Sequence, residues 1–74
     1  MLKSIYSKEH SFLVEQLKKA RVSAGLDQEE VARLLRRSQS YISKIESGQR
    51  RVDIVQLKKF AKIYKKDLNY FIKK

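Results

Sequence analysis

The chain has 74 residues and no cysteine, so it forms one domain at most, and neither a disulfide framework nor a thiolate metal site can support its small core. Its 18 Lys and Arg residues against eight Asp and Glu give a net charge of +10, and a hydrophobic content of 42% argues against disorder. The absence of proline and the presence of only two glycines suit a chain that is nearly all helix.

The positive charge is concentrated in the second half of the chain. Residues 33–66 contain eleven basic residues against two acidic ones, and a basic surface of that size attracts a polyanion, most often nucleic acid. A solvated lysine-rich surface is the plain alternative, and charge alone leaves both open. No apolar run approaches the roughly 18 residues that cross a bilayer, so we expect a soluble, cytoplasmic protein.

The first expected helix follows an N-terminal arm. Residues 1–10 show no clear period and are expected to form this arm, which leaves residues 11–74 as the folded domain. Apolar residues then recur with helical spacing at Leu13, Leu17, Ala20 and Ala24. Gly25 stands where a helix end favours a left-handed residue, so we expect the helix to stop there.

Two short helices are expected next. Asp27 and Glu30 form a capping box for a helix that runs to about residue 35, with the buried residues Val31, Ala32, Leu34 and Leu35. Ser38 is the N-cap candidate of a third helix, which turns Ile42 and Ile45 inward and ends at Gly48. The two or three residues between these helices match a helix-turn-helix connection.

The last part of the chain predicts two more helices. Asp53 and Gln56 have the spacing of a second capping box, and the inward residues of this fourth helix are Leu57, Phe60, Ala61 and Tyr64. Asp67 is the cap candidate of a short terminal helix with Leu68, Phe71 and Ile72 inward. The expected fold class is therefore all-α, with five helices and short loops.

The segments GLDQEEVARLL and SQSYISKIESGQRR resemble the phage repressor and Cro-like regulators of the XRE-type helix-turn-helix family. The resemblance spans roughly residues 12–72 and rests on matching residues in the family's order: Arg21, Gly25, Leu26, Gln28, Glu29, Glu30, Ala32, residues 38–42, Ile45, Glu46, Gly48 and Leu57. It implies a compact lambda-repressor-like domain. It also implies a sequence-specific regulator of transcription, most simply a repressor, that binds a palindromic operator in double-stranded DNA as a homodimer.

The resemblance assigns DNA contacts to the third helix and its surroundings. Gln39, Ser40 and Lys44 are the expected base readers, since Gln can bond adenine and Lys can reach guanine. Gln28, in the first turn of the second helix, is expected to hold the DNA backbone and to brace Gln39. The other expected backbone contacts are Ser38, Tyr41, Ser43, Arg21, Arg37, Gln49, Arg50 and Arg51. A solvated polar face is the alternative for these residues.

The family also pairs a first-helix arginine with a glutamate near the end of the third helix. In this chain the pair is Arg21 and Glu46, expected to be partly buried and to turn Arg21 toward a phosphate. Four positions depart from the family: Arg36 and Lys65 stand where glycine is common, Arg37 where an apolar residue is common, and Val52 where proline is frequent. A left-handed backbone at Arg36 would carry a cost without glycine, so the turn after the second helix is expected to differ in detail. In place of the family's glycine and apolar residue, Arg36 and Arg37 are expected to add contacts to the DNA phosphates.

Other functional classes leave weaker signals. With a single histidine, His10, no cysteine and no glycine-rich phosphate loop, we expect no enzyme, no metal site, no cofactor and no small-molecule ligand. The expected dimer interface involves Tyr70, Phe71 and Ile72. An antitoxin or bridging module, using the same fold to bind a protein such as a toxin, is the alternative function. A membrane-active peptide is disfavoured by the separate capped helices.

Overall fold

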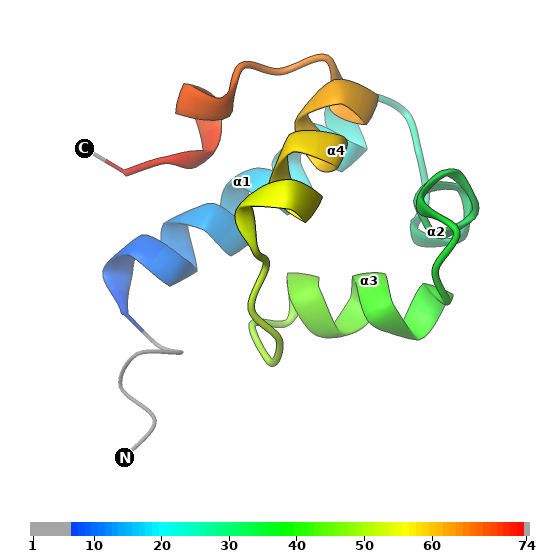
Figure 1. Cartoon of the computed structure of the whole chain (residues 1–74), viewed down its shortest axis with the longest axis horizontal. Helices are drawn as coiled ribbons and strands as arrows, with labels where there is room; N and C mark the ends of the chain where they lie inside the picture. Colours follow the sequence, from blue (N-terminus) through cyan, green and yellow to red (C-terminus); the bar gives the residue numbers. More distant parts are fainter. Residues whose placement is uncertain (1–6, 74) are drawn as a thin grey trace.

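The computed structural model describes residues 7–73. Within them lie four α-helices and one turn of 3-10 helix, without a strand: α1 (Lys8–Ser23), α2 (Gln28–Leu35), α3 (Gln39–Glu46), α4 (Ile54–Tyr64) and η1 (Leu68–Phe71) (Figure 1). The all-α class is therefore right and the count of five α-helices is wrong, because the last element is a four-residue 3-10 turn. None of these helices is long and apolar enough to cross a membrane.

Helix α1 begins earlier than the sequence indicated. The Ser7 side chain accepts a hydrogen bond from the backbone N–H of His10 at 3.1 Å, which caps the helix and starts it at Lys8. The last three residues of the expected arm are therefore helical. Its first six residues lie outside the described part of the chain.

The predicted caps of the two middle helices are present. Asp27 and Glu30 form a complete capping box, with each side chain 2.8 Å from the other's backbone nitrogen. The Ser38 hydroxyl accepts from the backbone N–H of Tyr41 at 3.2 Å. Local side-chain hydrogen bonds thus set where both helices of the motif start.

The caps of the later elements differ from expectation. Asp53 accepts from the backbone N–H of Gln56 at 2.9 Å, but the Gln56 side chain is buried instead of returning to the Asp53 backbone, so the box is half formed. Gln56 lies one turn before Phe60 on the face of α4 that packs inward, and that position sends its amide into the core. The Asp67 side chain makes no capping hydrogen bond.

Four positions in the described residues have a left-handed backbone, and two of them are not glycine. Gly25 and Gly48 have φ of +74° and +83°, while Arg36 and Lys65 have φ of +59° and +57°. Directly after Arg36, the backbone N–H of Arg37 donates a hydrogen bond to the Ala32 carbonyl at 2.9 Å, which ends α2 with a Schellman-type C-terminal cap. The turn that the family makes with glycine is therefore kept here, at a cost of about 1–2 kcal/mol per non-glycine residue.

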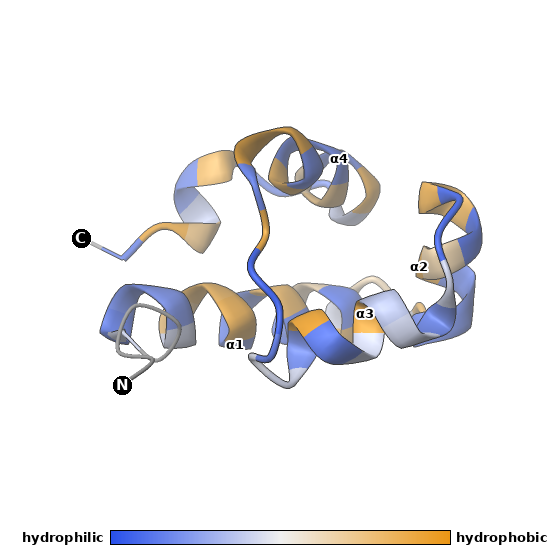
Figure 2. Ribbon diagram, turned by 60° about the horizontal axis from the view of Figure 1, so that its bottom comes forward, coloured by the Kyte–Doolittle hydropathy of each residue, from blue (hydrophilic) through white to orange (hydrophobic). Residues whose placement is uncertain are grey.

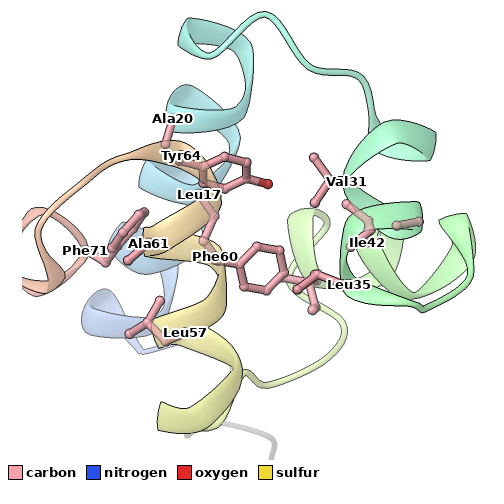
Figure 3. Close-up of a cluster of buried hydrophobic side chains, with 12 residues drawn as sticks. Leu17, Ala20, Val31, Leu35, Ile42, Leu57, Phe60, Ala61, Tyr64 and Phe71 are labelled. Carbon is pink, nitrogen blue, oxygen red and sulfur yellow. The ribbon is translucent and has the colours of Figure 1, made fainter.

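The core is formed by apolar side chains from all five elements (Figure 3). Phe60 projects from α4 toward Leu35 of α2, and Leu17 of α1 lies beside them (Figure 3). Phe60 and Phe71 are each only 1% exposed. Because full burial of such a side chain contributes about 1.5–3 kcal/mol, these two rings anchor α4 and η1 to the rest of the domain.

Three residues expected in the core are exposed. Leu34 is 60% exposed because Val31, Ala32 and Leu35 already form the inward face of the short α2, and Leu34 points about 100° away from Leu35. Ile72 lies just beyond the 3-10 turn and is 48% exposed. Ala24, the C-terminal cap of α1, is also exposed.

Helix α3 lies along one edge of the molecule, with α2 beside its start and the loop of residues 47–53 at its end (Figure 1). Coloured by hydropathy, the outer side of α3 is mainly hydrophilic (Figure 2). Ile42 and Ile45 are the buried residues of α3, at 0% and 1% exposed, and they fix which side of the helix faces the core. The opposite side is left free to meet a partner.

Candidate nucleic-acid interface

The outer face of α3 carries the three expected base readers. All three are exposed. Ser40 and Lys44 lie on the side of the helix away from Ile42 and Ile45, whereas Gln39, three residues before Ile42, lies on the flank that faces α2. Ser43 is half-buried. Gln39 and Ser40 occupy the first turn and Lys44 the turn after it, so polar groups line one face of the helix along its length.

A chain of hydrogen bonds runs from Gln39 back to the first helix; we call the four side chains Gln39, Gln28, Glu46 and Arg21 the relay. The Gln39 amide nitrogen donates to the Gln28 amide oxygen, so the first turn of α2 does brace the start of α3. The Gln28 amide nitrogen in turn donates to the Glu46 carboxylate at 3.1 Å. This second contact ties Gln28 to the far end of α3 and was not expected from the sequence.

The relay ends in a salt bridge. Arg21 donates to both carboxylate oxygens of Glu46, at 2.7 Å from Nε and 3.1 Å from Nη2, and to the Leu26 carbonyl at 2.9 Å from Nη1. The two side chains are only 13% and 6% exposed. The hydrogen bond with Glu46 raises the pKa of Arg21 above its usual value. Because Arg21 makes three hydrogen bonds inside the protein and is little exposed, its main role is to join α1 to α3, and little of its surface is left for DNA.

Tyr64 lies close to this salt bridge on the core side. Burial raises the pKa of its phenol well above the usual value, and the Glu46 carboxylate adds to the rise. The hydroxyl has no hydrogen-bond partner within residues 7–73. The sequence placed Tyr64 in the core by its spacing but could not show that its hydroxyl would be left unpaired there.

A second polar group surrounds Tyr41 near the start of α3. The guanidinium carbons of Arg37 and Arg50 lie 4.7 and 4.8 Å from the centre of the Tyr41 ring. These residues border a shallow depression lined by Arg36, Arg37, Ser38, Ser40, Tyr41, Lys44 and Arg50. We call its four cations and the tyrosine ring, namely Arg36, Arg37, Lys44, Arg50 and Tyr41, the cationic cluster.

The cationic cluster suits an anion. All four cations are exposed, and none has an ion-pair partner in the described residues. The tyrosine ring holds Arg37 and Arg50 by cation–π contacts, each contributing about 0.5–1 kcal/mol at an exposed site. Arg36 was expected from the sequence as a departure from the family and as an added phosphate contact. Its place beside Lys44 and Arg50 depends on the turn after α2, which sequence spacing does not reveal.

Other expected site residues do not join these two groups. Gln49 and Arg51 are exposed in the loop after α3 but do not line the depression. The three residues of the expected dimer interface, Tyr70, Phe71 and Ile72, do not form one exposed patch. Phe71 is 1% exposed, and its ring packs edge-to-face with that of Tyr70, with 5.1 Å between the ring centres. Phe71 is therefore a core residue and cannot meet a second copy, whereas Ile72 is exposed.

Residues 17–71 match the profile of the family described as Helix-turn-helix, and the chain belongs to this family, in its XRE-type, Cro-like branch. Helix-turn-helix proteins of this kind are regulators of transcription that bind double-stranded DNA. The fold and the exposed polar face of α3 thus define a DNA-binding transcriptional regulator.

Among solved structures, the chain is similar to the restriction-modification controller protein C.AhdI from Aeromonas hydrophila. The two are 29% identical, with a TM-score of 0.74, over 89% of this chain and 100% of the controller protein. The comparison with curated protein sequences gave no significant match.

Proposed function

We propose that the protein is a sequence-specific regulator that places α3 in the major groove of its operator and represses transcription by occupying that site. One observation carries this proposal: on the free edge of the molecule, the polar face of α3 adjoins a cluster of four cations that have no ion-pair partner in residues 7–73. Base edges are read by hydrogen-bonding side chains in the groove, whereas cations beside the groove neutralise phosphates.

The site residues are assigned to the bases or to the DNA backbone according to their position around α3. Gln39, Ser40 and Lys44 read bases, because they are exposed along the outer face of α3. The DNA backbone is held around that face by the rest of the cationic cluster (Arg36, Arg37, Arg50 and Tyr41) together with Gln28, Ser38, Ser43, Gln49 and Arg51. Arg21 contributes mainly by holding Glu46, because most of its guanidinium is covered.

The regulator acts as a homodimer on a palindrome in this proposal, since one helix-turn-helix reads few base pairs. With Phe71 in the core, the apolar surface that supports a dimer is the first turn of α4, where Ile54 and Val55 are 55% and 60% exposed. This turn follows the loop after α3, so a contact there would set two copies of α3 side by side. A Val55→Lys variant should then sediment as a monomer, whereas Leu34→Lys should not change the assembly.

Selection of binding sites from random duplexes tests the whole proposal. We expect a palindromic site with half-sites about 34 Å apart, one turn of B-DNA. Gln39→Ala and Lys44→Ala should each relax the preference at one base pair per half-site by about 1–3 kcal/mol. Recovery of no preferred sequence would contradict sequence-specific recognition, and recovery of a single unpaired half-site would contradict the dimer.

The similarity to a restriction-modification controller protein supports a regulatory role. No described surface favours a protein partner over DNA, so the antitoxin or bridging alternative remains the second candidate only on the basis of family membership. If the chain bound no duplex in the selection and instead co-purified with the product of a neighbouring gene, that alternative would replace the present proposal.

A further inference from the structure

The relay contains one member that can only accept hydrogen bonds. An ionised carboxylate has no proton to donate, and Glu46 is paired with the Arg21 guanidinium through both of its oxygens. Any side-chain amide that bonds Glu46 must therefore turn its nitrogen toward it. Gln28 does so, with its amide nitrogen 3.1 Å from a Glu46 oxygen.

This constraint passes along the relay from amide to amide. With its nitrogen committed to Glu46, Gln28 presents its oxygen to Gln39, which must then turn its own nitrogen inward, as observed. One N–H of Gln39 is used in that bond. The outward edge of Gln39 is left with one N–H donor and one carbonyl acceptor.

This pair of groups matches one purine and not the other. In the major groove adenine offers an N6 donor beside the N7 acceptor, whereas guanine offers two acceptors, O6 and N7. In the observed orientation, the outward N–H and carbonyl of Gln39 complement the N7 acceptor and N6 donor of adenine. The reversed amide, with its oxygen inward and both N–H groups outward, would suit guanine instead.

We propose that Glu46 is a positioning residue for base selectivity, which orients the Gln28 and Gln39 amides so that Gln39 selects adenine over guanine. The inference rests on the proposed function, in which Gln39 faces a base. The Glu46 side chain is itself only 6% exposed and so has almost no surface to offer a base. Its effect on the base is exerted through Gln28.

The informative variant is Glu46→Gln, which keeps the size of the side chain but can donate as well as accept. Either placement of the new amide sets its NH₂ against an Arg21 N–H, so the two orientations of the relay become comparable in energy. The duplex position read by Gln39 is first identified as the one where Gln39→Ala loses its preference. Affinities for duplexes with adenine or guanine there are then measured by fluorescence anisotropy.

We expect the wild-type protein to prefer adenine by about 5- to 150-fold, which corresponds to one good bidentate contact. Glu46→Gln should lower this ratio at least about fivefold. Gln28→Met keeps the Arg21–Glu46 pair but removes the link, so it should lower the ratio as well. Adding Glu46→Gln to Gln28→Met should then change the ratio no further, because the path from Glu46 to Gln39 is already cut.

Leu57→Val is the matched control, because it loosens the core on α4 away from the relay. It should lower the melting temperature and leave the adenine-to-guanine ratio as in the wild type, and circular dichroism would confirm that each variant is folded. An unchanged ratio in Gln28→Met, a wild-type preference for guanine, or a Glu46→Gln effect that persists beside Gln28→Met would overturn the inference. A wild type that selects no sequence would instead contradict the proposed function.

Discussion

The two polar groups around α3 are built in opposite ways. The relay starts at the exposed Gln39, is held by hydrogen bonds of defined direction, and ends in a covered salt bridge whose side chains are 13% and 6% exposed. The four cations of the cationic cluster are exposed, and two of them, Arg37 and Arg50, are held by cation–π contacts to the Tyr41 ring. A covered, directional network fixes orientation, whereas exposed charges supply attraction that salt can screen. Under the proposed function, we therefore expect the relay to act on selectivity and the arginines of the cationic cluster to act on affinity.

The largest expected effect is on the covered side. Arg21→Ala removes one partner of the salt bridge and leaves the Glu46 carboxylate covered and unpaired, which should lower the free energy of unfolding by about 3–5 kcal/mol. Urea unfolding followed by circular dichroism measures this loss. Lys44→Ala, on the exposed side of α3, is the control and should change stability by less than about 0.5 kcal/mol. A loss below about 1 kcal/mol in Arg21→Ala would place the salt bridge among weak surface pairs.

The next effect concerns the exposed side and affects binding instead of folding. Replacing both Arg37 and Arg50 with alanine should weaken binding to every duplex and make the plot of log affinity against log salt shallower by about 0.9 for each phosphate that is no longer neutralised. The double variant should melt near the wild-type temperature, because exposed cation–π contacts contribute little. Arg33→Ala is the control, because Arg33 is an exposed cation of α2 that does not line the depression. A slope equal to that of the wild type would show that the cluster does not meet phosphates.

A smaller effect is expected at Tyr64, on the core side of the relay. Tyr64→Phe removes a buried hydroxyl that has no partner in residues 7–73, so the variant should be as stable as the wild type or more stable by about 1 kcal/mol at pH 7. Tyr41→Phe, on the exposed side, is the control and should change little. A decrease of more than about 1 kcal/mol in Tyr64→Phe would show that the hydroxyl is satisfied in solution.

The same residue predicts a dependence on pH. Because the pKa of folded Tyr64 is raised, its contribution to stability is fully present below the unfolded value of about 10 and is lost as the pH rises from there toward the folded pKa. Above pH 10, the wild type should therefore lose stability more steeply than Tyr64→Phe, by up to about 1.4 kcal/mol per pH unit. Parallel pH profiles would argue against the buried phenol.

The smallest effect concerns the backbone beneath the cationic cluster. Arg36 has φ of +59°, so Arg36→Gly should be more stable than Arg36→Ala by about 1 kcal/mol, since both lose the charge and only glycine tolerates this conformation. Thermal unfolding of the pair measures the difference. Equal melting temperatures would indicate that the turn relaxes when the arginine is removed.

The starts of α2, α3 and α4 could be predicted because the interactions that set them are local. The Asp27–Glu30 box and the Ser38 cap join residues three apart, and Gly25 and Gly48 act at their own positions. Where the tertiary environment intervened, local reasoning was wrong. Gln56 turned into the core instead of completing its box, and Leu34, expected inside, is exposed.

In the candidate site, too, some features follow from local sequence and others depend on tertiary packing. The polar face of α3 follows from the helical period once Ile42 and Ile45 are inside. The link from Gln28 to Glu46 joins residues 18 apart, and the stacking of Arg50 on Tyr41 joins a loop to a helix. No spacing rule predicts either contact, because both depend on how the elements pack.

By itself, then, the sequence determined the helix-turn-helix class, the N-terminal caps of α2, α3 and α4 and the excess of positive charge, since each depends on residue type and on neighbours within a turn or two. Only the tertiary structure decided which amides share hydrogen bonds, which cations gather around Tyr41 and which of the terminal aromatic residues lies in the core. Those outcomes depend on the packing of five elements around Phe60 and its neighbours, which brings together side chains that the chain keeps apart.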